Sequence, residues 1–263
     1  MAITDPDLAI VAAQTGAATV RSRFGTSLAR VDKGGGDFAT AADLESERAI
    51  VEILRTARPG DVVVGEEGGR SGAGDSDRVW LVDPLCGTLN YTAHTRLVAV
   101  NVALRIGAEV PVAAAADPFT GEVFWTDGVR AFLRRGGADE PLAPSGDSGL
   151  VDVDVEPPFP NAPRFRAVHL LADPGFAARF RPRMVSTSLA VAWVAAGRRA
   201  AYVTDNDVWD NVHFAAGIAL CRAAGCVVTG LRGQPLHSGV GGLVAAADRA
   251  THDELLALIE RQF

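Results

Sequence analysis

Five short apolar runs in the middle of the chain constrain its fold more than any other feature. They lie at residues 62–64, 79–82, 97–106, 111–118 and 122–127. Turn-forming residues separate them, and short apolar runs bounded by turns predict buried β-strands. The region therefore predicts a β-sheet with a largely antiparallel arrangement.

A long helix is predicted near the start of the sequence. Asp5 and Pro6 are typical of a helix start, because aspartate caps free N–H groups and proline fits the first turn. Apolar spacing then predicts a helix over residues 7–24. The residues expected on its buried face are Leu8, Val11, Ala12 and Thr15.

A second helix is predicted over residues 40–58, where Thr40 and Asp43 have the spacing of a capping box. Its inward-facing residues are expected to be Ile50, Ile53 and Leu54. Residues 33–37 (KGGGD), between the two helices, predict a flexible loop. Two helices followed by a sheet indicate an α+β layer over residues 1–146.

The second half alternates between the two kinds of element. Residues 138–163 are rich in Pro, Gly and Asp, with one strand candidate at 150–155. The elements expected after them are helices at 188–197, 214–225 and 251–261, and strands at 200–204, 226–230 and 241–247. This alternation indicates an α/β subdomain over residues 147–263.

Composition narrows the class of protein. The formal net charge of −7 is unfavourable for binding nucleic acid or an anionic membrane surface, which attract basic proteins. The three cysteines form no C-x-x-C pair, which predicts a reducing compartment. No signal-like N-terminus or membrane-length apolar run is present. We therefore expect a cytoplasmic protein with a small-molecule partner.

Residues 80–91 (WLVDPLCGTLNY) carry the clearest chemical motif. An apolar strand places Asp83 at its end, Pro84 is expected to stop strand pairing, and Gly87-Thr88 opens a new element with free N–H groups. A carboxylate beside such N–H groups suits a divalent cation and a phosphate.

This motif resembles the D-P-x-D-G-T-x-N signature of the inositol monophosphatase family. Lys33, Asp37, Thr40 and Asp43 resemble the family's K-x-x-x-D-x-x-T-x-x-D segment. Other segments that resemble the family are Gly65-Glu66-Glu67, Trp209-Asp210 with a later Ala-Ala-Gly, and the terminal AGCVVTG…GQPL. The resemblance implies a layered α-β-α-β-α sandwich of the inositol monophosphatase and fructose-1,6-bisphosphatase type. It also implies a magnesium-dependent, lithium-sensitive phosphatase that forms a homodimer, with the active site where the two halves meet.

The resemblance also implies residue roles. Glu66, Asp83 and the Leu85 carbonyl are expected to hold the first metal, while Asp43 and Thr88 orient the attacking water. The amides of Gly87 and Thr88 are expected to hold phosphate. Each residue also has a simpler interpretation: Glu66 in a polar turn, Asp83 as a strand-end cap, and Asp43 and Thr88 as helix caps.

The C-terminal metal ligand has two candidates. The family places an aspartate four residues before the glycine of its W-D-x-A-A-G motif. Here Asp210 lies seven residues before Gly217 and His213 lies four before it. Because Trp209-Asp210 is the better local match, we expect Asp210 to be the ligand, with His213 as the alternative.

Cys86 stands where the family has an aspartate that binds the second metal and touches a substrate hydroxyl. Three interpretations compete, in this order: a small substitute that weakens the second metal site, a ligand for a softer metal such as Zn²⁺, and a nucleophile. The nucleophile is disfavoured because Arg96, the next arginine, is ten residues downstream, too far for a C-x5-R phosphate loop.

The substrate side also departs from the family pattern. Ser186 lies in a VSTSL segment where the family often has G-S-x-A-L, and Val203-Thr204 replaces a glutamate that contacts a sugar hydroxyl. Asp205 and Asp207 are candidate substitutes or simple loop charges. We expect Mg²⁺-dependent hydrolysis of an inositol, sugar, histidinol or nucleotide phosphate, with Mn²⁺ or Zn²⁺ as other possible metals. The alternative is an impaired homologue that binds a phosphorylated metabolite or a partner without turnover.

Overall fold

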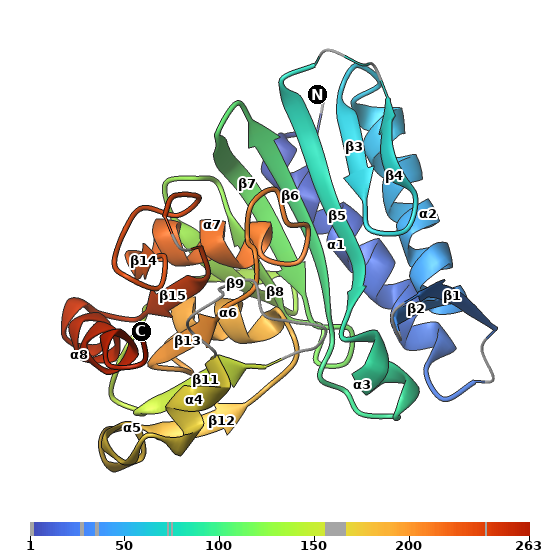
Figure 1. Cartoon of the computed structure of the whole chain (residues 1–263). Coiled ribbons are helices and arrows are strands. Elements are labelled where there is room, and N and C mark those ends of the chain that lie inside the picture. The colour runs from blue at the N-terminus through green and yellow to red at the C-terminus, as the bar shows by residue number, and fades with distance from the viewer. Residues whose placement is uncertain are drawn as a thin grey trace. The chain divides into compact units, whose positions relative to one another are not determined.

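The computed structural model describes residues 3–26, 29–34, 37–72, 74, 76–155, 167–239 and 241–263, which fall into two compact units (Figure 1). Unit 1 comprises Met1–Pro141, Thr187–Leu189 and Val212–Leu220. Unit 2 comprises Leu142–Ser186, Ala190–Asn211 and Cys221–Phe263. Two short segments from the second half of the sequence thus belong to unit 1. The subdomain junction near residue 146 stays a prediction.

Unit 1 is built on an eight-stranded sheet in the order β10-β9-β8-β7-β6-β5-β3-β4. Its helices and strands are α1 (Asp5–Arg23), β1 (Arg30–Gly34), β2 (Asp37–Thr40), α2 (Ala41–Ala57), β3 (Val62–Gly65), β4 (Gly69–Gly72), β5 (Arg78–Cys86), α3 (Thr88–Thr92), β6 (Ala99–Ile106), β7 (Glu109–Ala116), β8 (Val123–Thr126), β9 (Ala131–Arg135) and β10 (Ala138–Pro141). All five predicted strands are present, and every pairing in this sheet is antiparallel except that of β3 with β5.

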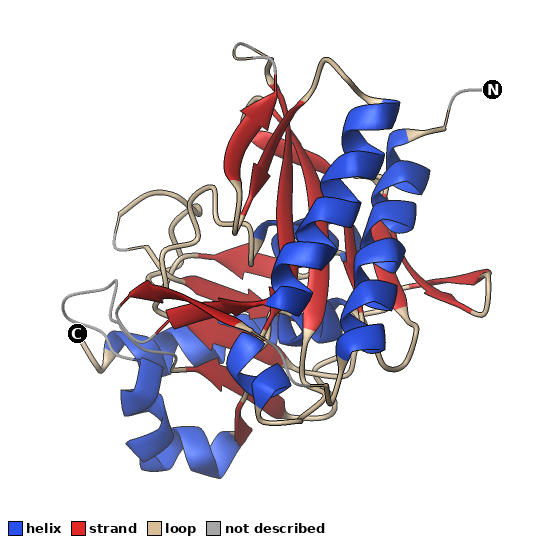
Figure 2. Ribbon diagram, turned by 90° about the vertical axis from the view of Figure 1, so that its right-hand side faces the viewer, coloured by secondary structure: helices blue, strands red, loops and turns tan. Residues whose placement is uncertain are grey.

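Helices α1 and α2 lie side by side against this sheet (Figure 2). The predicted capping box at Thr40 and Asp43 is confirmed and begins α2. The predicted buried face of α1 is partly wrong, because Val11 is 41% exposed. Small residues turn inward instead: a Cβ on Gly16 would lie 2.6 Å from Ile50 Cδ1 on α2 and 2.9 Å from Val100 on β6. This close approach leaves no room for a larger side chain.

Strand β5 does not stop at Pro84, which corrects the expectation that proline ends its pairing. The strand continues to Cys86, which pairs with Ala99 on β6 after an irregularity that follows Asp83. A bulge of this kind accommodates proline, since the residues within it leave the regular ladder. It also changes the register of the pairing with β6 between Asp83 and Cys86.

The expected flexible loop at residues 33–37 is partly wrong. Lys33 lies in β1 and Asp37 begins β2, and the two strands pair antiparallel as a hairpin. Residues 35–36 of the expected loop lie outside the described residues. Lys33 is therefore presented by a strand.

Unit 2 has a five-stranded mixed sheet in the order β12-β11-β13-β15-β14. The helices and strands of the second half are β11 (Leu150–Asp154), α4 (Ala167–Ala172), α5 (Pro174–Arg179), β12 (Arg181–Met184), α6 (Leu189–Ala195), β13 (Ala201–Thr204), α7 (Ala215–Ala224), β14 (Val227–Thr229), β15 (Leu243–Ala246) and α8 (Arg249–Glu260). The predicted alternation of helix and strand is confirmed after residue 188, whereas α4, α5 and β12 were not predicted. Part of the Pro-rich segment, residues 156–163, lies outside the described residues. Across the described chain, no helix combines the length and apolar character that a membrane span requires.

Candidate active site

Glu66 and Asp83 meet because the strands before them are neighbours. Strand β3 pairs parallel with β5, with Gly65 opposite Val82, so both carboxylates leave the same edge of the sheet. Asp83 is completely buried, and its Oδ1 accepts a hydrogen bond of 3.1 Å from the Leu85 amide. The sequence predicted this juxtaposition from two strand ends, and the register confirms it.

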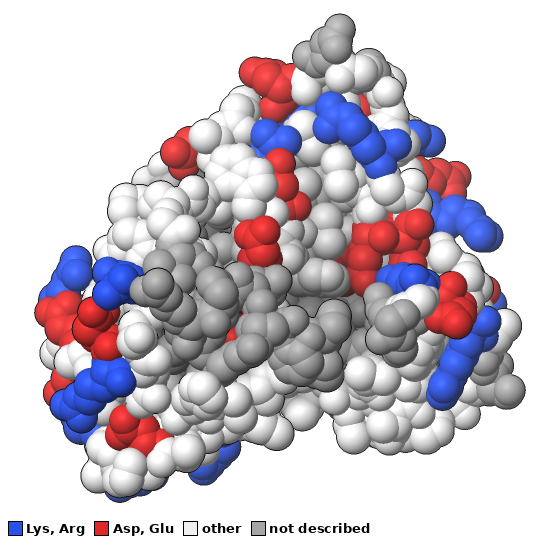
Figure 3. Space-filling view, in the orientation of Figure 1, with Lys and Arg blue, Asp and Glu red and all other residues white. Residues whose placement is uncertain are grey.

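The two carboxylate oxygens of Glu66 have different surroundings. Its Oε1 accepts a hydrogen bond of 2.9 Å from Lys33 Nζ, while its buried Oε2 accepts none from the described residues. Burial and the nearby Asp83 carboxylate raise the pKa of Glu66 to about 8. The site therefore brings together two carboxylates, and one of their oxygens, Glu66 Oε2, is buried without a hydrogen-bond donor among the described residues. A cation would stabilise this arrangement. Figure 3 shows acidic side chains gathered beside a basic one between β4 and β2.

Glu47 on α2 positions the turn that carries Glu66, and sequence reasoning missed it. Its carboxylate accepts hydrogen bonds from the amides of Glu67 at 2.8 Å and Gly68 at 2.6 Å. A Cβ on Gly65 would lie 2.5 Å from the same carboxylate, so the turn needs glycine there. Glu47 precedes the buried Ile50 by three residues, and a glutamate on a buried helix face is the signal that could have revealed it.

We expect Glu47→Ala to lower the free energy of unfolding by about 2 kcal/mol, because hydrogen bonds to a charged acceptor contribute roughly 1.5–3 kcal/mol each. Misplacement of Glu66 should lower metal affinity as well. Glu45→Ala is the matched control on the same helix, since it removes only an exposed ion pair with Arg23, usually worth less than about 1 kcal/mol. Urea unfolding and metal titration measure both effects, and equal losses in the two variants would contradict this role of Glu47.

Asp43 and Thr88 form the second predicted pair. Thr88 Oγ1 lies 3.0 Å from Asp43 Oδ1 and 3.2 Å from the Leu85 carbonyl oxygen. Asp43 Oδ2 accepts a hydrogen bond of 2.8 Å from the Thr40 amide, so the capping box and the contact with Thr88 coexist. Burial raises the pKa of Asp43, although its hydrogen bonds act in the opposite direction. The pair therefore offers a hydroxyl backed by a carboxylate.

Gly87 connects β5 to α3 in a conformation that favours glycine. It is the N-cap of α3, with φ of 97°. A Cβ at this position would lie 2.8 Å from the Leu97 carbonyl oxygen. The helix cap is therefore Gly87, and Thr88 is the first residue of the helix, which corrects the simpler interpretation of Thr88 as the cap.

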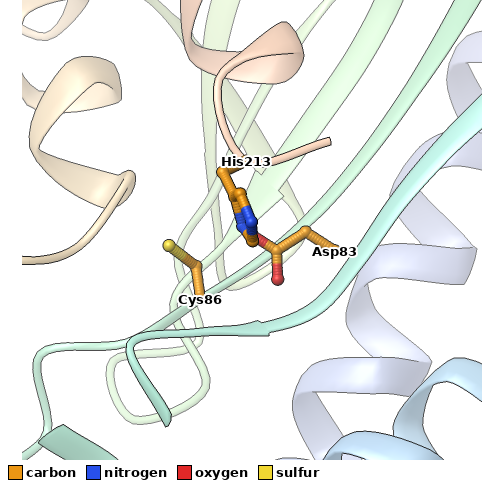
Figure 4. A group of neighbouring side chains, drawn as sticks. All are labelled: Asp83, Cys86 and His213. Carbon is orange, nitrogen blue, oxygen red and sulfur yellow. The ribbon is translucent and has the colours of Figure 1, made fainter. Parts of the chain in front are cut away.

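Asp83, Cys86 and His213 come together within unit 1 (Figure 4). His213, just before α7, has Nδ1 2.8 Å from Asp83 Oδ2 and 4.0 Å from Glu66 Oε2. Burial alone would lower the pKa of His213, but Asp83, Cys86 and Glu66 together outweigh it and raise that pKa well above its usual value. Burial and Asp83 raise the pKa of Cys86 to about 11, so the thiol is protonated near neutral pH. A protonated thiol is a poor nucleophile.

Two further residues support this group and were missed. Asn101 on β6 donates from Nδ2 to Asp83 Oδ2 at 3.2 Å and to Ser188 Oγ at 2.8 Å. The Ser188 amide donates to Cys86 Sγ at 3.2 Å. An asparagine flanked on both sides by buried apolar residues of the strand could have signalled Asn101. No local pattern connects Ser188 with Cys86, which lies 102 residues earlier.

Two predicted site residues belong to unit 2. Asp210 is exposed in the turn before α7 and has φ of 46°, a left-handed conformation that is uncommon outside glycine. Ser186 precedes α6. The roles of Asp210 as metal ligand and Ser186 as substrate contact stay predictions, while His213 is the candidate that unit 1 brings to Asp83.

The donors present fit a divalent cation. Glu66, Asp83 and the Leu85 carbonyl offer oxygen atoms, which hard cations such as Mg²⁺ prefer. The unsatisfied Oε2 of Glu66 is the strongest sign of this fit, since buried polar atoms normally have a partner. Cys86 and His213 add sulfur and nitrogen beside them.

Comparisons with known proteins agree with these motifs. The model of the inositol monophosphatase family matches residues 5–262. An inositol-1-monophosphatase of Caulobacter vibrioides is 32% identical over 94% of this chain and 97% of its own. The Nus factor SuhB of Pasteurella multocida is 32% identical over 83% of this chain and 81% of its own.

A solved structure extends the agreement to the fold. The extragenic suppressor protein suhB of Bartonella henselae superimposes with a TM-score of 0.83 at 25% identity, over 97% of this chain and 98% of its own. The predicted layered fold of the inositol monophosphatase and fructose-1,6-bisphosphatase type is thereby confirmed. The motifs around Asp83, the match along nearly the whole sequence and the shared fold lead to one assignment: the chain belongs to the inositol monophosphatase family.

Proposed function

We propose that this protein hydrolyses a small phosphate monoester with the help of a divalent cation, Mg²⁺ first, with Mn²⁺ or Zn²⁺ as alternatives. The observation that carries the proposal is the pairing of two sets of residues. The carboxylates of Glu66 and Asp83 share a sheet edge, and the Asp43–Thr88 pair adjoins the Leu85 carbonyl. A relative named inositol-1-monophosphatase supports the same activity.

In this proposal, Glu66, Asp83 and the Leu85 carbonyl would hold the cation. A bound cation supplies electrostatic stabilisation of the charge on the transferring phosphoryl group. The amides of Gly87 and Thr88 bind the phosphate oxygens, as the family motif implies. The lack of a side chain on Gly87 allows this close approach.

Asp43 and Thr88 prepare the attacking water. Thr88 Oγ1 donates a hydrogen bond to Asp43 Oδ1, so its lone pairs are free to accept a hydrogen bond from the water. This orients the water oxygen toward phosphorus. As the water gives a proton to Thr88 Oγ1, Thr88 passes its own proton to Asp43, whose raised pKa makes its carboxylate a stronger base.

Thr88→Val should lower kcat by roughly 100-fold or more, because a positioned acid–base group contributes about 10²–10⁴-fold. KM should change little, since the lost hydroxyl acts on water and not on substrate. Thr92→Val is the matched control, as it removes a hydroxyl from the same helix that donates a hydrogen bond to the Leu89 carbonyl. Steady-state phosphate release measures both, and an unchanged kcat in Thr88→Val would contradict the role of Thr88.

The substrate is identified by a panel of phosphate monoesters. Inositol, sugar, histidinol and nucleotide phosphates are offered at saturating Mg²⁺, and released inorganic phosphate is measured. We expect one class to exceed the others in kcat/KM. Ser186→Ala and Asp210→Asn then test the predicted contributions of unit 2, which should affect KM and metal affinity respectively. The proposal fails if no monoester in the panel releases phosphate with any of the three cations.

A second candidate function is binding without turnover. Cys86 favours it, because the motif position that carries a carboxylate in the family here holds a protonated thiol. The relative named Nus factor SuhB also suggests a role in association with a partner. Retained binding of a phosphorylated ligand by calorimetry, together with no phosphate release, would identify this function.

The homodimer and the cytoplasmic location are also part of the proposal. The resemblance to the family supports the first, and the low cysteine content supports the second. Light scattering at micromolar concentration measures the oligomeric state. The mass of a monomer would contradict the proposed homodimer.

A further inference from the structure

Cys86 and His213 form, with Asp83, a group of donors that differs from the oxygen set of Glu66 and Leu85. One ligand atom from each of the three side chains lies within 4.8 Å of the other two. Asp83 and Cys86 come from the two sides of the irregularity in β5, and His213 comes from the segment before α7 (Figure 4). All three belong to unit 1.

The chemistry of these donors selects the kind of ion. A carboxylate oxygen, a sulfur and an imidazole nitrogen together match the ligands of Zn²⁺, which accepts all three atom types. Mg²⁺ and Ca²⁺ prefer oxygen alone, so the sulfur of Cys86 and the ring nitrogen of His213 gain little from them. Both atypical residues of this site therefore favour the same class of metal.

The spacing of the donors is close to that of a zinc site. Ligands about 2.0–2.3 Å from zinc in a tetrahedron lie roughly 3.3–3.8 Å from one another. The donor atoms lie within 4.8 Å of one another, and His213 Nδ1 is 2.8 Å from Asp83 Oδ2, so shifts of up to about one ångström are needed, which side-chain rotation can supply. Three protein ligands leave a fourth position open, as in catalytic zinc sites.

Neighbouring groups hold two of the ligands in place. The Ser188 amide donates to Cys86 Sγ, and the Leu85 amide donates to Asp83 Oδ1, which leaves Asp83 Oδ2 toward His213. Hydrogen bonds of this kind orient metal ligands and raise metal affinity by about 10–100-fold. Asn101 adds a third support at Asp83 Oδ2.

We propose that Asp83, Cys86 and His213 form a binding site for Zn²⁺, distinct in metal class from the magnesium position of Glu66, Asp83 and the Leu85 carbonyl. The inference rests on the proposed function only in that both positions share Asp83. When zinc binds, the thiol of Cys86 and the imidazolium of His213 each lose a proton to solvent, so Cys86 coordinates as thiolate and His213 as neutral imidazole. Of the three interpretations of Cys86, the geometry thus favours the zinc ligand.

Cobalt substitution tests the sulfur ligand directly. Co²⁺ occupies zinc sites, and its bond to a thiolate gives an intense near-ultraviolet charge-transfer band. We expect the chelator-treated natural protein to show this band and to saturate at one equivalent of Co²⁺, with Zn²⁺ displacing it. Cys86→Ser should abolish the band and lower the affinity for Zn²⁺ by at least about 100-fold.

Cys226→Ser is the matched control, because it removes another half-buried thiol while leaving Cys86 in place. The band should persist in this variant. Circular dichroism and thermal unfolding confirm that both variants fold. Absence of the band from the natural protein, or its persistence in folded Cys86→Ser, would overturn the proposal.

The outcome is separable from that of the proposed function. Phosphate release with Mg²⁺ but without a cobalt–thiolate band would refute the zinc site and leave the phosphatase proposal intact. A band without hydrolysis of any monoester would support the zinc site and refute the phosphatase proposal.

Discussion

Asp83→Asn is expected to abolish phosphate release and to weaken the binding of Mg²⁺ or Mn²⁺ by more than about 100-fold. Asp83 is completely buried, with Oδ2 2.8 Å from His213 Nδ1 and Oδ1 accepting a hydrogen bond from the Leu85 amide. The change removes a negative charge from a hard-cation site. Loss of an outer-shell partner alone costs roughly 10–100-fold in metal affinity, and loss of a ligand costs more.

Asp61→Asn provides the matched control for this change. Asp61 is a buried carboxylate of the same unit, but it binds Arg78 and Trp80, nearer the start of β5. Asp61→Asn should reduce stability while leaving metal affinity close to that of the natural protein. Calorimetric titration with Mg²⁺ or Mn²⁺ measures the metal affinity of the two variants and of the natural protein. An unchanged affinity in Asp83→Asn would contradict the interpretation of this site as a metal site.

Cys86→Asp is expected to raise Mg²⁺-dependent turnover by at least about tenfold, because it replaces a soft donor with a hard oxygen ligand. The same change should weaken Zn²⁺ binding. The new carboxylate would add negative charge beside Asp83 and Glu66, so added metal should also raise thermal stability more than in the natural protein.

Lithium gives a second readout of the same substitution. In the family, Li⁺ inhibits at the second metal position, whose ligands include the aspartate that Cys86 replaces. Since Li⁺ is small and hard, sulfur should hold it weakly. We expect the natural protein to be less inhibited by lithium than Cys86→Asp at the same Mg²⁺ concentration. Equal inhibition, or no gain in turnover and metal binding, would show that Cys86 does not limit the Mg²⁺ reaction.

The parts of the fold that sequence reasoning predicted have local signals. The capping box at Thr40, the five apolar strands and the helix–strand alternation after residue 188 all depend on neighbours in sequence. The buried face of α1 does not depend on sequence neighbours alone. It is determined by a close approach at Gly16 to two other elements, which periodicity within α1 cannot reveal.

The site shows the same division. Asp83, Glu66, Asp43 and Thr88 were predicted because they lie in recognisable motifs, and the first two meet through the parallel pairing of β3 with β5. Hydrogen bonds across long sequence separations escaped prediction, since they depend on tertiary packing. Glu47 bonds a turn 20 residues later, and Asn101 bonds Ser188 87 residues later. His213 was predicted only as the alternative to Asp210, and its contact with a carboxylate 130 residues earlier depends on the same tertiary packing.

The continuation of β5 past Pro84 has a further consequence for the site. A proline normally removes a ladder hydrogen bond, and a strand was therefore expected to end there. The irregularity after Asp83 absorbs the proline and lets Cys86 pair with Ala99. Asp83 and Cys86 thus both reach His213, although they lie three residues apart on one strand.

Phosphate release by chelator-treated protein tests the central claim most directly. The natural protein and Asp83→Asn are stripped of metal and offered the best substrate of the monoester panel, and Mg²⁺, Mn²⁺ or Zn²⁺ is then added back. We predict no release without metal, release by the natural protein after at least one cation is restored, and none by Asp83→Asn. Release by the stripped protein, or equal release by Asp83→Asn, would contradict a metal-dependent reaction at Asp83.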